Sequence, residues 1–358
     1  MRKPFLLLVV VCMMLPVQEN KACTAFFLEQ SGRMVVAKNL DWPVDLGYVL
    51  YNPAGKKKEA FQNDGPTRPF HWTAQYSSIT FNQFGVGFPL GGMNSRGLVV
   101  EELNMPRVRI EKDTTRRQLN EFQLVQFLLD HCANVEEVVK RLKHLHYAPL
   151  VLHLHYFVAD QTGKTAILEF DGTRWQTFFP EKPEHAVLSN NPYPESLRYL
   201  ENFKGFGGEM PVIHRQGSNE RFVSAAHIIQ SGYQEDLRQQ AFSILDTVKQ
   251  EDTRWSIVYD ITGRKVFFRF HNCRQQKVFH LKKLMNQHTD YIPGCNLKNC
   301  RCTKEGGFHA VTREENTALL KNLGKALSRY PGFSPTDTLL PAMARWGNRF
   351  LTDQSGAR

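Results

Sequence analysis

The sequence predicts an α+β fold in which antiparallel sheets pack against separate groups of helices. Short β-prone runs occur in pairs around tight turns, which is typical of antiparallel hairpins. The helical stretches are grouped between these hairpins and do not alternate with single strands. The chain has 358 residues, of which 42% are hydrophobic and 22% charged, and this composition indicates an ordinary globular protein.

The first 22 residues have the layout of a secretory signal peptide. A basic head of Arg2 and Lys3 precedes an apolar run from Phe5 to Leu15, which is too short to span a bilayer. Ala22 is the small residue expected before a cleavage site. We therefore expect an exported protein, periplasmic or secreted, whose mature chain begins at Cys23. The alternative is a buried N-terminal helix or strand.

The predicted strands form hairpins around turns at residues 31–33, 91–97, 160–164 and 261–264. Residues 45–75 are expected to form loops and short strands. The remaining strands are expected at Thr24–Glu29, Met34–Leu40, Tyr76–Thr80, Leu98–Leu103, Val151–Ala159, Thr165–Phe170, Trp255–Asp260, Lys265–His271 and Val278–Leu281.

Helices are predicted in four stretches of the chain. Residues 121–131 have apolar side chains at the spacing of one helical face. A second helix is expected to start at Asn134, with Glu137 completing a capping pair, and to run to about Leu145. Residues 192–250 are expected to be mainly helical. A closing helix is expected at residues 316–330, followed by a Pro-rich, polar tail.

Composition and cysteine use exclude several classes of function. The formal net charge is +10, but the basic residues are scattered, so neither nucleic-acid binding nor a membrane role after signal removal is expected. Cys295, Cys300 and Cys302 are the place where a disulfide is expected. No histidine completes a zinc set there, and His153 and His155 lack an evident third ligand. We expect no metal and no cofactor.

The first hairpin is expected to gather reactive side chains at one end. If its turn centres on Ser31 and Gly32, the positions of paired residues sum to about 63, so Cys23 lies opposite residue 40 or its neighbours. Directly opposed side chains have Cβ atoms about 5 Å apart. Cys23, Lys38, Asn39 and Asp41 should therefore lie close together.

Cleavage after Ala22 would place a free α-amine beside the thiol of Cys23. The amine titrates near pH 7.7–8.0 and a cysteine near 8.5, so the amine can accept the thiol proton near neutral pH. Lys38 would also favour the thiolate, and Asp41 can hold the amine or the thiol by a hydrogen bond. The alternatives for Cys23 are a disulfide partner, a small buried side chain and a lipid anchor; the polar Asn20 and Lys21 argue against lipidation.

A series of motifs resembles the choloylglycine hydrolase family, also called the linear amide C–N hydrolases, which includes bile salt hydrolases and penicillin V acylases. Each motif alone is weak, but their shared order is specific. The resemblance covers residues 23–282. The motifs lie at residues 23–27 (CTAFF), 38–42 (KNLDW), 92–98 (GMNSRGL), 103–106 (LNMP), 155–160 (HYFVAD), 187–192 (VLSNNP), 218–223 (SNERFV) and 255–260 (WSIVYD).

The resemblance implies a four-layer αββα sandwich of two antiparallel sheets, the N-terminal-nucleophile hydrolase fold. It implies hydrolysis of a small-molecule N-acyl amide through an acyl-enzyme on Cys23, with Asp41 orienting the amine. Asn104 and Asn190 would donate hydrogen bonds to the oxyanion, and Arg221 would add positive charge. It also implies a homo-oligomer, often a tetramer. Residues 283–358 lie outside the resemblance, as a C-terminal extension on the same domain or a tail.

Two features qualify what the resemblance implies. The family usually has arginine where this chain has Lys38, and lysine lacks the planar five-donor fork. Taken alone, Asn104 could simply end a strand, Asn190 could form a turn, and Arg221 could make a surface ion pair.

The asparagine at position 104 is typical of family members that cleave conjugated bile salts, whereas penicillin V acylases often have tyrosine there.

Conjugated bile salts are therefore the expected substrates. Penicillin V and N-acyl homoserine lactones are the alternatives within the same reaction class. An acyltransferase is a further alternative, and it would need an amine acceptor that outcompetes water. A surface lipoprotein that uses the same fold as a binding module, without hydrolysis, is the alternative from another class.

Overall fold

The structure, a computed structural model, describes residues 23–61, 70–111, 117–232, 235–271, 273–286, 289–297, 307–330 and 337–351. Residues 1–22, on which the signal-peptide prediction falls, lie outside the described residues, as do Cys300 and Cys302.

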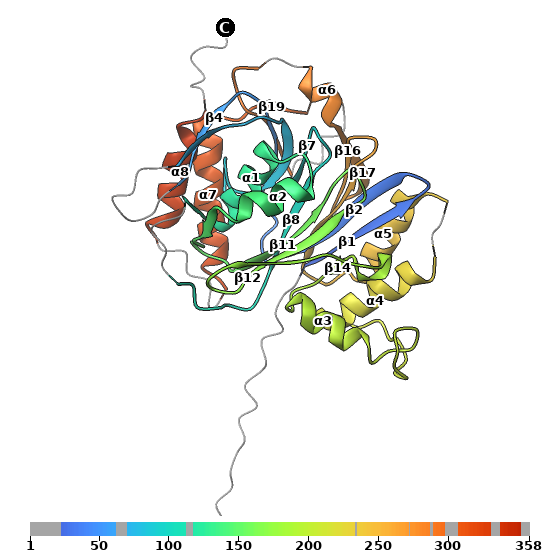
Figure 1. Ribbon diagram of the computed structural model, residues 1–358. Helices are drawn as coiled ribbons and strands as arrows, with labels where there is room; N and C mark the ends of the chain where they lie inside the picture. The colour runs from blue at the N-terminus through green and yellow to red at the C-terminus, as the bar shows by residue number, and fades with distance from the viewer. Residues whose placement is uncertain are drawn as a thin grey trace, which may run out of the picture.

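Two large antiparallel sheets pack face to face, and helices cover the outer face of each (Figure 1). The stacked rings of Phe81 and Phe268, one from each sheet, lie 5.5 Å apart between centroids. The predicted α+β class is confirmed, and the layers follow the αββα order that the family resemblance implied.

The six-stranded sheet carries the N-terminal hairpin at its centre. Helices α3 (Tyr193–Leu200), α4 (Ser218–Gln230) and α5 (Leu237–Thr247) belong to its outer layer, where α5 packs on the hairpin (Figure 1). In spatial order its strands are β14 (Val187–Leu188), β1 (Thr24–Gln30), β2 (Arg33–Asp41), β15 (Thr253–Asp260), β16 (Lys265–Phe270) and β17 (Cys273–His280).

The nine-stranded sheet is covered by α1 (Glu121–His131), with α2 (Val135–Leu142) following it. In spatial order its strands are β13 (Trp175–Phe178), β12 (Thr165–Phe170), β11 (Leu154–Ala159), β8 (Val99–Asn104), β7 (Pro89–Asn94), β6 (Ser78–Asn82), β3 (Tyr48–Asn52), β18 (Pro293–Asn296) and β19 (His309–Ala310). The smaller elements are β4 (Lys57–Glu59), β5 (His71–Thr73), β9 (Arg117–Leu119), β10 (Leu145–Tyr147), η1 (Pro183–His185) and α6 (Leu281–Met285).

The hairpin of β1 and β2 has the predicted register. Its loop is only Ser31 and Gly32, with φ of 50° and 75°, which is the geometry of a type I′ turn. Thr24 pairs with Asn39 and Ala25 with Lys38. The start of β1 therefore lies beside the end of β2, as the turn position predicted.

The predicted helices are confirmed, with three differences. The closing helix expected at residues 316–330 is found at Arg313–Leu327, three residues earlier at both ends. Helix α2 starts as expected, because the side-chain oxygen of Asn134 accepts a hydrogen bond from the Glu137 N–H at 2.9 Å. It ends at Leu142, since β10 begins at Leu145. Helix α1 has the predicted bounds. The sequence predicted one buried apolar face, but all residues of the helix are buried, including the polar ones.

Part of the turn predicted at residues 91–97 is strand β7. A Cβ on Gly91 would lie 2.2 Å from Glu101 Oε2 on β8, and one on Gly92 would lie 2.3 Å from the carbonyl oxygen of Ile79. Glycine is thus required at these two positions because neighbouring strands come too close to leave room for a side chain. The tight turn itself is confined to residues 94–97, where the Gly97 N–H donates to the Asn94 carbonyl at 2.9 Å.

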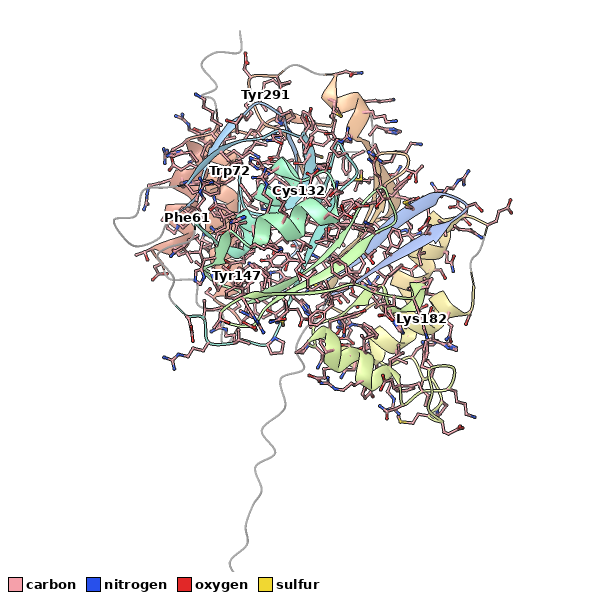
Figure 2. All side chains as sticks on the ribbon, in the orientation of Figure 1. Phe61, Trp72, Cys132, Tyr147, Lys182 and Tyr291 are labelled. Atoms are coloured by element: carbon pink, nitrogen blue, oxygen red, sulfur yellow. The ribbon has the colours of Figure 1, made fainter. Side chains whose placement is uncertain are left out.

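The polar tail predicted after Tyr330 contains a helix, α8 (Leu339–Asn348). Pro341 lies in its first turn, where a proline is tolerated because the N–H there needs no intrahelical partner. Helix α8 packs with α7 (Arg313–Leu327) (Figure 1). Trp346 contacts Phe88, with ring centroids 5.0 Å apart. Phe61 and Trp72 lie on this side of the molecule (Figure 2).

Among the described residues, no helix has both the length and the apolar character needed to cross a bilayer.

The substitution Leu323→Ala should lower the free energy of unfolding by about 2–5 kcal/mol, because it removes a buried side chain and leaves a cavity. Leu323 is buried on α7 in the main core. Urea denaturation measures the change, and Lys321→Ala, at an exposed position of the same helix, should stay within about 0.5 kcal/mol. Two separate transitions would contradict a shared core.

Candidate active site

Cys23 lies immediately before β1, and its side chain is buried. Ala25 pairs with Lys38, and residues two apart on a strand share a face. Lys38 reaches the nine-stranded sheet, so Cys23 also faces the space between the sheets. Burial raises the pKa of the Cys23 thiol to about 12, although Lys38 and a hydrogen bond from the Asp41 backbone act to lower it. Lys38 thus acts in the predicted direction, but burial outweighs it.

Lys38 connects the two sheets through a buried ion pair. Its Nζ lies 2.8 Å from Glu101 Oε2 and 3.4 Å from Glu102 Oε1, and both acids belong to β8. Burial opposes the charge on Lys38, but the two carboxylates outweigh it and raise the pKa of the ammonium. Lys38 therefore stays charged beside Cys23.

Asp41, the last residue of β2, is fully buried. Its Oδ1 accepts a hydrogen bond from the Thr253 hydroxyl, and its Oδ2 accepts one from Gln250 Nε2 at 2.9 Å. Burial raises the pKa of Asp41 to about 6, against the opposing charge of Arg221 and these two hydrogen bonds. The carboxylate is therefore held in place by the first residue of β15, Thr253, and by Gln250, three residues before that strand.

Arg221 reaches the same point from α4. Its Nε donates to Thr24 Oγ1 at 3.0 Å, and its Nη2 lies 3.4 Å from both the Cys23 carbonyl and Asn190 Oδ1. Its Nη1 donates to the Gln216 carbonyl. The surface ion pair considered for Arg221 is therefore wrong, because the side chain is buried and connects β1 to the segment that carries Asn190.

Asn190 and Asn104 are in direct contact. The side-chain Nδ2 of Asn190 donates to the Asn104 carbonyl at 2.6 Å, and the Asn190 backbone N–H donates to Ser218 Oγ at 2.9 Å. The backbone N–H is thus already engaged. An oxyanion would have to use the second hydrogen on the Asn190 Nδ2.

A buried acid–histidine pair supports the Asn190 segment. Glu169 Oε1 accepts a hydrogen bond from the Tyr193 N–H at 2.7 Å and lies 3.1 Å from His155 Nδ1. The pair joins β12 and β11 to the start of α3, three residues after Asn190. Among the described residues, no group of three or more acids, histidines and cysteines is arranged to hold a metal ion.

Sequence reasoning missed several residues that hold the predicted ones. One signal was present: the run from Val99 to Leu103 has two adjacent acids in an otherwise apolar strand, and such acids need a partner when buried. The residues missed are Glu101, Glu102, Glu169, Ser218, Gln250 and Thr253.

The six sequence-predicted residues form one connected group at one end of the two sheets. Cys23, Lys38 and Asp41 come from the first hairpin, and Arg221 joins them to Asn190 and so to Asn104. The arrangement contains a thiol, a fixed ammonium, a buried carboxylate and amide donors. These are the groups that nucleophilic attack on an acyl carbon requires.

The solved structures that share this fold include one penicillin V acylase and two variants of a conjugated bile acid hydrolase. Penicillin V acylase from Agrobacterium tumefaciens is 21% identical with a TM-score of 0.69, covering 81% of this chain and 98% of that one. Two variants of conjugated bile acid hydrolase from Clostridium perfringens, one with cysteine replaced by alanine and one with arginine replaced by leucine, each have a TM-score of 0.61. They are 17% and 16% identical, covering 74% of this chain and 95% of theirs.

The predicted N-terminal-nucleophile hydrolase fold is confirmed by these structures. A search of curated protein sequences found no match. The family model described as linear amide C–N hydrolases, choloylglycine hydrolase family, matches residues 23–225, which is more than half of the chain. The chain therefore belongs to the choloylglycine hydrolase family of linear amide C–N hydrolases.

Proposed function

We propose that this protein hydrolyses a linear N-acyl amide through an acyl-enzyme on Cys23, which becomes the N-terminal residue when residues 1–22 are removed. The observation that carries the proposal is the convergence of Cys23, Lys38, Asp41 and Arg221 at one buried point. The match to the family model begins at Cys23 itself, which supports a mature chain starting there.

The α-amine of the mature chain acts as the base in this mechanism. It accepts the thiol proton while Asp41 holds the amine, and the thiolate attacks the carbonyl carbon of the substrate. The oxyanion is stabilised by Asn190 Nδ2 and the nearby positive charge of Arg221. The ammonium then protonates the leaving amine, and a thioester remains. Water, deprotonated by the α-amine, releases the acid and restores the thiol.

Cleavage before Cys23 would activate the thiol. In the full chain the nitrogen of Cys23 is part of a peptide bond and cannot act as a base. The thiol pKa of about 12 keeps it protonated at neutral pH, and the thiolate is the reactive form. Removal of residues 1–22 would supply the base.

Conjugated bile salts are the substrates we propose. The reason is Asn104, which occupies the position where bile-salt-cleaving members of the family have asparagine and which binds Asn190 directly. Penicillin V and N-acyl homoserine lactones are the alternatives. The solved structures that share the fold are named for both penicillin V and conjugated bile acids, and they favour neither.

Export to the periplasm or the outside of the cell is part of the same proposal. Cys295 on β18 is disulfide-bonded, as expected for the C-terminal cysteine cluster, while Cys23 and Cys132 form no disulfide. Disulfides persist in oxidising compartments and are rare in the cytosol. The bond therefore supports a protein that leaves the cytosol and keeps Cys23 available for catalysis.

The mature protein, beginning at Cys23, should release product from taurocholate or glycocholate, and Cys23→Ala should abolish the release. Penicillin V and a long-chain N-acyl homoserine lactone complete the panel, and amine release measures turnover. Cys132→Ala is the matched control, because Cys132 is a buried cysteine at the end of α1 (Figure 2). Failure on all four substrates, or a lipid on Cys23 by intact mass, would support the binding module.

Hydrolysis should show a further loss as the pH drops below about 6, beyond the loss caused by protonation of the α-amine near pH 7.7–8.0, because Asp41 then takes up a proton and holds the amine less firmly. An unperturbed aspartate would protonate near pH 3.9. In this protein the raised pKa of about 6 moves the loss of activity upward. The measurement is kcat between pH 4 and 8; constant kcat from pH 7 down to pH 5 would contradict the role of Asp41.

Arg221→Lys should lower kcat by about 100-fold, since small misplacements of reacting groups cost that much. Lysine keeps the charge, but a single nitrogen cannot reach Thr24, the Cys23 carbonyl and Asn190 together. Arg215→Lys, at an exposed position three residues before α4, should leave kcat unchanged. Equal rates for Arg221→Lys and the wild type would show that the guanidinium only neutralises charge.

A further inference from the structure

The ion pair that connects the sheets contains one more carboxylate than it has ammonium groups. Lys38 faces Glu101 and Glu102, and the exposed fractions of the three residues are 1%, 1% and 4%. Two buried carboxylates cannot both be neutralised by one ammonium. A buried charge without a full partner is costly, so one acid of such a pair favours its protonated form.

The two acids are held differently. Glu101 Oε2 is the nearer to Lys38, at 2.8 Å, and Glu101 Oε1 accepts a hydrogen bond from the Tyr259 hydroxyl. The side chain also occupies the space that Gly91 leaves open on β7. Glu102 approaches Lys38 at 3.4 Å. Glu101 is therefore the main partner of Lys38, and Glu102 is the acid that can gain or lose a proton with less disturbance of the pair.

Glu102 and Lys38 act on the thiol of Cys23 in opposite directions. The ammonium of Lys38 favours the thiolate, whereas the carboxylate of Glu102 disfavours it. Because Glu101 already balances the charge of Lys38, the state of Glu102 decides whether the three buried side chains together carry no net charge or a net negative charge. Burial raises the pKa of Glu102, although Lys38 and His155 act to lower it.

We propose that Glu102 is a positioning residue whose protonation sets the net charge of the Lys38 ion pair beside Cys23, and so sets the pH range in which this nucleophile reacts. The inference rests on the proposed role of Cys23. When Glu102 is protonated, Lys38 and Glu101 together carry no net charge, and no second carboxylate opposes the thiolate. When Glu102 ionises as the pH rises, the three side chains carry a net negative charge and the thiolate forms less readily.

Other charged and titratable groups face this cluster, and they define its surroundings. The groups whose charges act on Cys23 are Lys38 and Asp41 on β2, Glu102 on β8 and Arg221 on α4. The groups that interact electrostatically with Glu102 are Lys38, Glu101 on β8, His155 and Tyr156 on β11 and Tyr147 on β10.

Alkylation of Cys23 by iodoacetamide tests the proposal without any substrate. The mature protein and its variants are alkylated between pH 5 and 9, and peptide mass spectrometry separates Cys23 from Cys132. Glu102→Gln should move the rate profile about one unit to lower pH, because it removes a buried negative charge that disfavours the thiolate. At a fixed pH below the plateau this is an increase of about tenfold.

Two further variants separate charge control from loss of structure. Glu102→Asp keeps a carboxylate and should restore most of the wild-type profile. Glu101→Gln removes the other acid of the same pair and should move the profile by less than half as much. A thermal unfolding curve confirms that each variant is folded. A folded Glu102→Gln whose profile matches the wild type, or an equal shift in Glu101→Gln, would overturn the proposal.

The outcome is independent of whether the substrate proposal holds. If Glu102→Gln shifts the alkylation profile while no substrate is hydrolysed, the control of Cys23 by Glu102 stands and the proposed function fails. If hydrolysis depends on Cys23 but the profile does not move, the proposed function stands and the role of Glu102 is refuted.

Discussion

Because the loop between β1 and β2 contains only Ser31 and Gly32, each residue of β1 has a single partner on β2. A slip of one residue would turn every side chain of β1 to the other face of the sheet. Cys23 would then face the helices and not the space between the sheets. The position of the thiol, its contact with the Asp41 backbone and its distance from Lys38 all depend on this short turn.

The charged groups around Cys23 are buried, and burial gives them their properties. In water a lysine and two glutamates would interact weakly, but between two sheets their interaction is much stronger. Arg221 is constrained in the same way, since its guanidinium has partners on β1 and beside Asn190. The site is therefore a rigid set of charges whose balance changes when a single proton is gained or lost.

Much of this arrangement could be predicted from the sequence where local spacing determines it. The hairpin register follows from a two-residue turn, and the start of α2 follows from Asn134 and Glu137. The contact of Arg221 with Cys23 could not be predicted from spacing, since 198 positions separate them. The role of Gly91 was misread as a turn because its neighbour Glu101 is close only after β7 and β8 pair.

The strand β18 has a consequence for the behaviour of the chain in solution. It pairs with β3, whose five residues are all buried, and the two-residue β19 then forms the end of the described sheet. A long strand with unpaired backbone groups would recruit other chains and promote aggregation, whereas a very short edge strand does not. Strands β18 and β19 thus cover the edge of β3 and leave only a two-residue strand at the end of the described sheet, and neither carries a residue of the candidate site.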